Sequence, residues 1–239
     1  MLGRFLEIGI RTADIRASVE FYERLGFAQA RTGDTWSHPY GVMTDGRLFI
    51  GLHQSSIDSP ALTFVHADVA RHARALEAQG LTLAYQRTAE DEFHSIGLKD
   101  PNDQMLVLVE ARTFSPVERR AQRLSLCGYF EEYSIPSSDF TAAQAFWEPL
   151  GFVATAESDV PYLHLALTSD HLDIAFHRPR TSDQPMLVFR DALMQERLAK
   201  LRALAIGTWL KTPAGLDPQA NAFLAAPEGT ALLFLHDEI

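Results

Sequence analysis

Two glutamates occupy the same point of a repeated stretch and are the first candidates for chemistry. Residues 5–27 read FLEIGIRTADIRASVEFYERLGF and residues 130–152 read FEEYSIPSSDFTAAQAFWEPLGF, so Glu7 is repeated as Glu132. A carboxylate in an apolar hollow suits a cationic or hydrogen-bonding ligand, whereas one beside a base such as Arg11 is simply neutralised. Both interpretations stay open for each glutamate.

Histidines supply the partners that acid–base chemistry would need. His53 and His177 are also paired by the repeat, and His94 lies in a strand ahead of the turn DPND. A glutamate and a histidine can act as general acid and base if they come within hydrogen-bonding reach, which makes Glu132 and His177 candidate catalytic residues. The competing interpretation is that these histidines end their strands as solvated side chains.

The segment TWSHPYG, residues 35–41, contains two large aromatic residues. Trp36 and Tyr40 in this segment are predicted to form an aromatic wall or lid over a ligand cavity. Plain packing is the alternative for both rings, because large aromatic side chains contribute much of the buried area of a typical core.

Composition excludes several classes of partner. The 239 residues carry a net charge of −10, with 46% hydrophobic and 22% charged residues and no Lys/Arg-rich face. Nucleic acid and anionic membranes are therefore not expected partners. No apolar run is long enough for a membrane span, and no signal-peptide pattern is present. We expect a cytoplasmic protein.

A covalent mechanism finds no support in the sequence. The single cysteine, Cys127, begins a predicted strand, where a thiol is typically a small core residue. One cysteine cannot form an intrachain disulfide, which suits a reducing compartment. There is no serine elbow and no phosphate-binding glycine loop.

The elements that position these residues follow from the repeat itself. In each copy a strand is followed by an aspartate, Asp14 or Asp139, placed to cap the start of a helix. A glycine, Gly26 or Gly151, follows the helix end, where a left-handed residue is needed. Each copy therefore predicts a strand, a capped helix and a glycine stop.

Weaker copies of the same pattern follow each of these two, so the chain contains four strand–helix–three-strand (βαβββ) units. The units are approximately residues 5–54, 60–112, 128–178 and 184–238. We predict a first domain over 1–112, a polar linker over 113–126 and a second domain over 127–239. The fold class is α+β.

A unit with one helix covers one face of its sheet and leaves the other face free. Two units side by side would form a curved mixed sheet with a concave free face, which is a plausible ligand cavity. The residues that we expect to line such cavities are Glu7, Arg11, Trp36, Tyr40, His53, His94, Glu132, Asp173 and His177.

This arrangement resembles a known family. Paired βαβββ units that open with ADIRASVEFYERLGF (13–27) and close with DPNDQMLVLVE (100–110) are similar to the vicinal-oxygen-chelate (VOC) superfamily. That superfamily includes glyoxalase I, extradiol ring-cleaving dioxygenases, methylmalonyl-CoA epimerase, fosfomycin resistance enzymes and bleomycin resistance proteins. The resemblance covers nearly the whole chain and implies the fold, but one fold hosts many activities.

The resemblance also implies where a divalent metal would bind. The superfamily's enzymes hold the metal through His, Gln or Glu, with one ligand seven residues before the capping aspartate, where this sequence has Glu7 and Glu132. The points expected to supply the other ligands hold Ala61, Val107, Met186 and Leu233. Aliphatic groups cannot coordinate a cation, so we expect no cofactor; a metal at Glu132 and Asp173 is the alternative.

Three functional hypotheses follow. The first is a metal-independent protein of this superfamily that binds a small apolar or aromatic molecule through a glutamate. The second is a metal-dependent lyase, isomerase or ring-cleaving dioxygenase with a non-standard site around Glu132, Asp173 and His177. The third is a scaffold whose hollow is filled by its own side chains. The two halves are expected to pair within the chain, and a homodimer stays open.

Overall fold

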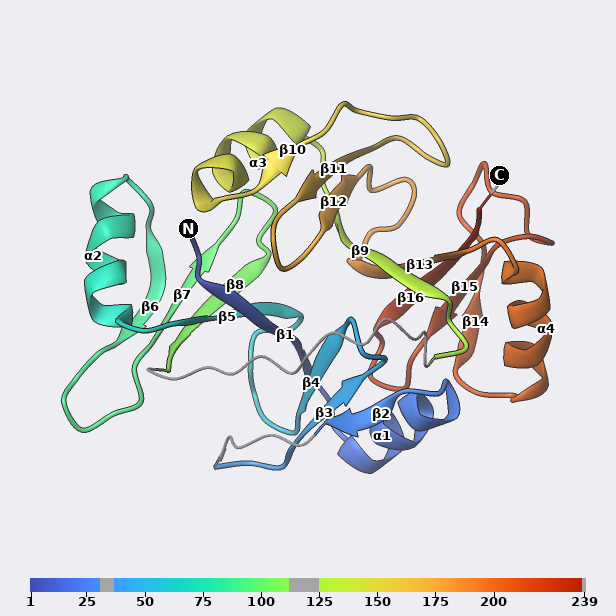
Figure 1. The fold of residues 1–239 in the computed structure, drawn as a ribbon, viewed down its shortest axis with the longest axis horizontal. Coiled ribbons are helices and arrows are strands. Elements are labelled where there is room, and N and C mark those ends of the chain that lie inside the picture. The colour runs from blue at the N-terminus through green and yellow to red at the C-terminus, as the bar shows by residue number, and fades with distance from the viewer. Residues whose placement is uncertain (31–36, 112–124, 238–239) are drawn as a thin grey trace.

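The computed structural model describes residues 1–30, 37–111 and 125–237. Two eight-stranded mixed sheets and four α-helices make up the described chain, which confirms the predicted α+β class (Figure 1). Helices α2 and α4 lie at opposite ends of the long axis of the molecule, and the sheets lie between them (Figure 1). No helix in these three ranges is long and apolar enough to cross a membrane.

The first sheet is built by the first two units, and its strand order is β2-β3-β4-β1-β5-β8-β7-β6. Its elements are β1 (Arg4–Arg11), α1 (Ile15–Arg24), β2 (Ala28–Ala30), β3 (Tyr40–Thr44), β4 (Phe49–His53), β5 (Ala61–His66), α2 (Val69–Ala78), β6 (Leu83–Arg87), β7 (Ser95–Lys99) and β8 (Met105–Glu110). The first strands of the two units, β1 and β5, pair antiparallel at the centre of the sheet.

The second sheet repeats this order as β10-β11-β12-β9-β13-β16-β15-β14. Its elements are β9 (Tyr129–Pro136), α3 (Phe140–Trp147), a 3₁₀ turn η1 (Glu148–Leu150), β10 (Val153–Ala154), β11 (His164–Thr168), β12 (Ile174–His177), β13 (Met186–Asp191), α4 (Met194–Ala203), β14 (Thr208–Leu210), β15 (Ala222–Ala225) and β16 (Ala231–His236). All four predicted βαβββ units are present.

The residues shared by the repeat have the local roles that the sequence predicts. The Asp14 carboxylate accepts hydrogen bonds from the backbone N–H groups of Arg16 and Ala17 at the start of α1, and Asp139 caps α3 in the same way. Gly26 has φ 90° and Gly151 has φ 104°, a left-handed conformation that glycine adopts without steric cost.

Each sheet has one face covered by helices and one face without them. The helix-covered faces of both sheets join in one continuous apolar core, in which the Phe27 and Phe189 rings from different halves lie 6.4 Å apart. The other surface, which we call the helix-free face, contains Glu7 in the first sheet and Glu132 in the second. Any ligand site of the predicted kind belongs to these faces.

A bulge next to each glutamate sets the register across the sheet centre. Between Phe5 and Glu7 the strand β1 advances two residues while β5 advances one, and β9 has the same irregularity before Glu132. As a result Glu7 faces Thr63, and Glu132 faces Val188.

This register also places Ala61 and Met186. Ala61 and Met186, at the points expected to supply further ligands, pair with Gly9 and Ser134 and not with the glutamates. Thr63 and Val188 are the residues opposite the glutamates, so Ala61 and Met186 lie two residues before them on β5 and β13.

Two predicted features fall outside the described residues. The linker 113–126 is described only at Ser125 and Leu126, and Trp36 is likewise not described. The backbone N–H of Leu126 donates a hydrogen bond of 2.7 Å to the carbonyl of Leu25, which ties the start of the second half to the end of α1.

Two buried polar contacts join the halves at positions related by the repeat. Trp147 Nε1 donates to Asp100 Oδ2 at 3.0 Å, from α3 to the turn before β8. Tyr22 Oη donates to Glu228 Oε1 at 2.8 Å, from α1 to the turn before β16. Tyr22 and Trp147 are fully buried, so each contact satisfies a polar atom that water cannot reach.

We predict that the Trp147→Phe variant is less stable than the wild type by about 2–3 kcal/mol. The variant loses the indole hydrogen bond to Asp100 and leaves a small cavity. Urea denaturation followed by circular dichroism measures the change. Trp209→Phe on the edge strand β14 is the matched control and should cost less than about 1 kcal/mol; equal losses would contradict the role given to the Asp100 contact.

Candidate functional site

The carboxylate of Glu7 is the centre of a hydrogen-bonded cluster on the first helix-free face. His53 Nε2 lies 2.9 Å from Glu7 Oε1, and Tyr40 Oη donates to Glu7 Oε2 at 2.5 Å. Glu7 is 1% exposed and His53 is 4% exposed. The Tyr40 ring also packs against the His53 ring, with 4.6 Å between centroids. The structure therefore brings together three of the predicted site residues.

A further histidine extends this cluster outward. His38 Nε2 lies 3.0 Å from His53 Nδ1, and the His38 side chain is half-buried where that of His53 is enclosed. Sequence reasoning did not select His38, although it belongs to the TWSHPYG segment. Its signal was its position in that segment, two residues before Tyr40 and the start of β3.

The hydrogen bonds fix which nitrogen of each imidazole carries the proton. A carboxylate only accepts, so His53 Nε2–H donates to Glu7 and His53 Nδ1 is left as an acceptor. His38 Nε2–H then donates to His53 Nδ1. Partial burial, and secondarily the neighbouring His53, lower the pKa of His38 below its ordinary value of 6.5. At neutral pH His38 is therefore mostly uncharged.

Glycines on β4 and β1 make room for the cluster. A Cβ atom at Gly51 would lie 2.2 Å from the carboxyl carbon of Glu7, which no real structure tolerates. A Cβ atom at Gly9 would lie 3.7 Å from His53 Nε2, which is ordinary contact. Gly51 is therefore needed for the carboxylate to occupy its position, whereas the site of Gly9 has room for a methyl group in ordinary contact with the histidine.

The second sheet places the equivalent residues differently. His177 Nε2–H donates to the carbonyl of Ser182 at 3.1 Å, so His177 Nδ1 accepts from Ser134 Oγ at 2.8 Å. Burial, foremost, lowers the pKa of His177 to about 4. His177 is thus a neutral, internally satisfied histidine that does not contact Glu132.

Glu132 is buried, and none of the residues that the structure describes forms a hydrogen bond with it. It is 7% exposed, and its carboxylate has no hydrogen bond or ion pair with any described residue. Burial, first of all, and then repulsion from Glu131 raise its pKa to about 8, against the opposing attraction of Arg190. Arg190 itself is bonded to Glu131, at 2.8 Å between Nε and Oε2. Glu132 is therefore mainly a neutral carboxylic acid at pH 7.

Side-chain size separates the two helix-free faces. Residues at equivalent ladder positions are mostly smaller in the first sheet than in the second. The pairs are Gly9 and Ser134, Gly51 and Ala175, Gly97 and Phe223, and Val107 and Leu233. At one position the size difference is reversed, because Met105 in the first sheet is larger than its counterpart Ala231 in the second.

The second helix-free face is consequently filled by its own side chains. Val188 and Leu233 are almost fully buried, and Tyr162 and Leu216 pack against this cluster. On the first face Phe49 remains half-buried. The two faces share a frame, but Val107 is half-buried on the first face, whereas its counterpart Leu233 on the second is fully buried.

The remaining predicted cavity residues lie away from Glu7. Arg11 is exposed at the end of β1, beside His53 in the next strand. His94 bonds to Glu110 at 3.0 Å at the far end of the sheet, and this contact raises the pKa of His94. Asp173 is exposed and accepts a hydrogen bond from Thr168.

The residues present do not fit the metal centre that the resemblance implies. Facing Glu7 across the first sheet are Thr63 and then Val107, and facing Glu132 across the second are Val188 and Leu233. Val107, Val188 and Leu233 offer no electron pair to a cation, so aliphatic groups occupy the points where the implied metal centre needs further ligands. Within the part of the chain that the structure describes, no three His, Cys, Asp or Glu side chains gather as a metal site.

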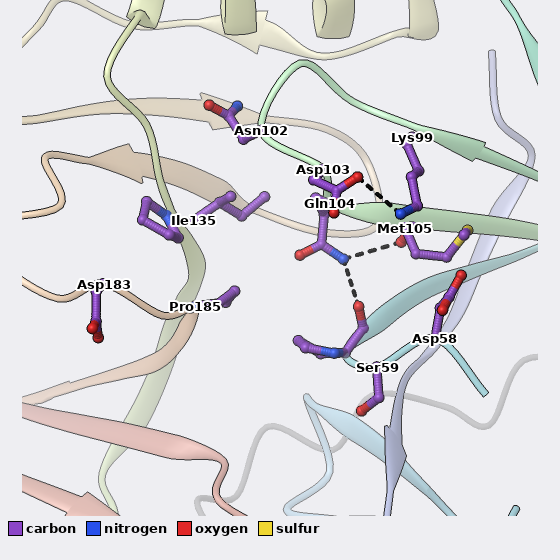
Figure 2. Close-up of a pocket in the computed structure, with 12 residues that line it drawn as sticks. Asp58, Ser59, Lys99, Asn102, Asp103, Gln104, Met105, Ile135, Asp183 and Pro185 are labelled. Atoms are coloured by element: carbon purple, nitrogen blue, oxygen red, sulfur yellow. Dashed lines mark hydrogen bonds and ion pairs between the residues drawn. The ribbon is translucent and has the colours of Figure 1, made fainter. Parts of the chain in front are cut away.

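Two clefts lie where the halves meet, next to the repeated turns. One of about 280 Å³ is shown in Figure 2; there Lys99 bonds to Asp103 at 2.8 Å, and Gln104 Nε2 donates to the carbonyls of Pro60 and Met105. These polar groups bond to one another, so we interpret the cleft as part of the contact between the halves and not as a ligand site.

The other cleft, of about 560 Å³, lies between the start of α1 and the turn at Glu228. The Glu228 carboxylate already accepts from Ser18, Tyr22 and Thr230. This second cleft is therefore also dominated by contacts that hold the halves together.

Comparison with known proteins identifies the fold. Solved structures match nearly the whole chain at low sequence identity. Homoprotocatechuate 2,3-dioxygenase from Brevibacterium fuscum, in complex with 3,4-dihydroxyphenylacetate, is 14% identical, with a TM-score of 0.66 over 99% of this chain and 81% of that one. The Mn(II)-bound glyoxalase from Novosphingobium aromaticivorans is 14% identical, with a TM-score of 0.60 over 96% and 80%.

A third solved structure also matches nearly the whole chain at low sequence identity. The 2,2',3-trihydroxybiphenyl 1,2-dioxygenase from Sphingomonas wittichii is 15% identical, with a TM-score of 0.60 over 98% of this chain and 90% of that one. No family profile and no curated protein matches the sequence. The chain therefore has the fold of these dioxygenases and this glyoxalase, which is the fold that the resemblance to the VOC superfamily implies, and identity this low establishes the fold alone.

We predict that Gly51→Ala disrupts the Glu7 cluster and lowers stability by about 1–3 kcal/mol. The new methyl group displaces the carboxylate from His53 and Tyr40, which breaks buried charge-assisted hydrogen bonds. Urea denaturation measures the loss. Gly41→Ala on the adjoining strand is the control, since its Cβ would meet only Ile15 at 3.9 Å; an equal loss there would show a general backbone effect.

A second prediction concerns Glu132 and pH. Its folded-state pKa of about 8 exceeds the ordinary value of 4.5, so folding disfavours the charged form. The wild-type free energy of unfolding should fall as pH rises from about 4.5 to about 8 and then level off. Glu132→Gln removes this loss, giving a gain on the order of 2–5 kcal/mol at pH 9 and none at pH 4.

Urea denaturation across this pH range tests the Glu132 prediction. Glu77→Gln, at an exposed position on α2, is the matched substitution and should be indistinguishable from wild type at every pH. A Glu132→Gln gain that does not grow with pH would show that the carboxyl is not held neutral by burial.

Proposed function

We propose that this chain is a metal-independent small-molecule binding protein whose ligand lies on the first helix-free face, near Glu7. The ligand would be an apolar or aromatic molecule that carries a hydrogen-bonding group. The observation that carries the proposal is the Glu7 carboxylate, held by His53 and Tyr40 on a face where Gly9 and Gly51 leave room for it.

Accessible apolar groups support this choice of face. Phe49, Tyr85 and Val107 are half-buried on strands of the first sheet, around the enclosed Glu7. Such side chains supply contact area to an apolar ring while a few polar groups fix its orientation. The equivalent of Val107 in the second sheet is Leu233, which is fully buried.

The polar group of the ligand would meet the outer members of the cluster. Tyr40 and His38 are half-buried, whereas Glu7 and His53 are enclosed. Both Glu7 oxygens already accept a hydrogen bond, one from Tyr40 and one from His53. A ligand hydroxyl would therefore be oriented through Tyr40 or His38 rather than by Glu7 directly.

The solved structures of similar fold agree with a hydroxylated aromatic ligand. One of them holds 3,4-dihydroxyphenylacetate, and another is named for a trihydroxybiphenyl substrate. The same names favour the alternative function, a metal-dependent ring-cleaving dioxygenase, and the glyoxalase is Mn(II)-bound. Near-stoichiometric Mn or Fe in the purified protein would promote that alternative.

We predict that 2-naphthol binds the protein equally well before and after exhaustive dialysis against EDTA, with Kd values within about twofold. Isothermal titration calorimetry measures both. Val107→Phe should weaken binding by at least about tenfold, because the larger ring occupies the accessible part of the face.

Val153→Phe on β10, where the side chain is 65% exposed, is the matched control and should bind like wild type. Binding that disappears with EDTA and returns with Mn²⁺ would replace the proposal with a metal site. Unchanged affinity in Val107→Phe would place the ligand elsewhere.

A further inference from the structure

We propose that the cleft of about 560 Å³ at the start of α1 binds a small molecule that carries a guanidinium group and a carboxylate. An arginine-type amino acid has this chemistry. The inference goes beyond the proposed function, because it concerns the junction of the two halves and not the helix-free face. Contacts between the halves account for Glu228 in this cleft, but they do not account for the other polar groups that line it.

The second half holds a guanidinium group of its own at the equivalent place. Arg178 Nη1 donates to the carbonyl of Ser138 at 2.5 Å and to that of Ser137 at 3.5 Å. The guanidinium carbon also lies 3.8 Å from the centre of the Phe140 ring, at the first position of α3. Carbonyl oxygens and an aromatic face are both favourable partners for a guanidinium. This part of the frame is therefore suited to that group.

The first half has the same backbone arrangement without the arginine. The backbone N–H of Thr12 donates to the carbonyl of the histidine that ends β4 at 2.9 Å, and that of Ser137 donates to the carbonyl of the histidine that ends β12 at 2.7 Å. The next residue is Gln54 in the first half and Arg178 in the second. Gln54 is uncharged and exposed at the cleft, so the first half supplies no guanidinium from this position.

The oxygen acceptors that Arg178 uses are open in the first half. Thr12 and Ala13 are the counterparts of Ser137 and Ser138 and line the cleft, and no described residue donates a hydrogen bond to either carbonyl. Ser55 Oγ, also at the cleft, is buried and has no hydrogen-bonding partner among the described residues. Buried polar atoms are normally bonded, and a guanidinium offers five N–H donors. A guanidinium ligand would therefore find several unused acceptors here.

The charges around the cleft favour a ligand with both signs of charge. Glu228 accepts hydrogen bonds from three hydroxyl groups and Asp14 accepts from backbone N–H groups, so both carboxylates are bonded to neutral donors. The counterpart of Glu228 before β8 is the uncharged Asn102. Arg11 is exposed and is the one cationic residue among the described residues that line the cleft. The ligand guanidinium would lie toward the carboxylates, and its own carboxylate would pair with Arg11.

The volume and the apolar part of the lining fit such a molecule. Small-molecule sites typically have volumes of about 300–1,000 Å³, and this cleft has about 560 Å³. Ala17 and Pro227 add small apolar groups to the polar ones. Apolar surface of this kind packs well against the methylene chain of an arginine.

Isothermal titration calorimetry with L-arginine and L-citrulline tests the chemistry of the ligand. Citrulline has the same shape but a neutral urea in place of the guanidinium, so we expect it to bind at least about tenfold more weakly. L-argininamide lacks the carboxylate and should also bind more weakly than L-arginine, because it cannot pair with Arg11. Absent binding of L-arginine, or equal affinity for L-citrulline, would overturn the proposal; equal affinity for L-argininamide would overturn the role given to Arg11.

Gln54→Arg tests the location of the site. The new side chain should bond within the cleft as Arg178 does in the second half, so we expect L-arginine to bind at least about tenfold more weakly. Gln79→Arg, at the exposed C-cap of α2, makes the same change of residue and charge and should bind L-arginine within about twofold of wild type. Wild-type affinity in Gln54→Arg, or an equal loss in Gln79→Arg, would show that this cleft is not the site.

Discussion

Burying a carboxylate is the constraint on which the first half of this protein depends. An ionised side chain loses several kcal/mol of hydration when it is enclosed, and only well-placed donors compensate for that loss. Glu7 is enclosed and has two donors, one on each oxygen. His53 on β4, Tyr40 on β3 and the missing side chain of Gly51 all serve this one arrangement.

The second half also buries a carboxyl group, but it holds that group in the neutral form. Glu132 stands at the same bulge but no described residue bonds to its carboxylate, and burial holds it mainly in the neutral form. His177 is satisfied by Ser134 and the Ser182 carbonyl, so it has no proton to offer Glu132. Equivalent sequence positions therefore give a paired carboxylate in one sheet and a protonated acid in the other.

The four βαβββ units could be predicted from the sequence because the signals that define them are local. Asp14 and Asp139 cap helices through backbone N–H groups two or three residues away, so their roles can be predicted without knowing the fold. The bulge before Glu7 cannot be predicted in this way, since it depends on pairing with a strand more than fifty residues later. The contact of His53 with Glu7, and the part played by His38, depend on that same long-range register and on the β3–β4 pairing.

Each sheet has two independent faces, which explains how two sheets of the same topology can have different polar contacts on their helix-free faces. Alternate residues of a strand point to opposite faces, so a change at Gly9 or Gly51 alters the helix-free face and leaves the helix-covered core untouched. Ile8 and Ile50, which alternate with those glycines, are fully buried in the shared core. The repeat could thus keep its folding residues while Gly9 and Ser134 diverged, and only the second sheet has a hydroxyl at this position to bond to the neighbouring histidine.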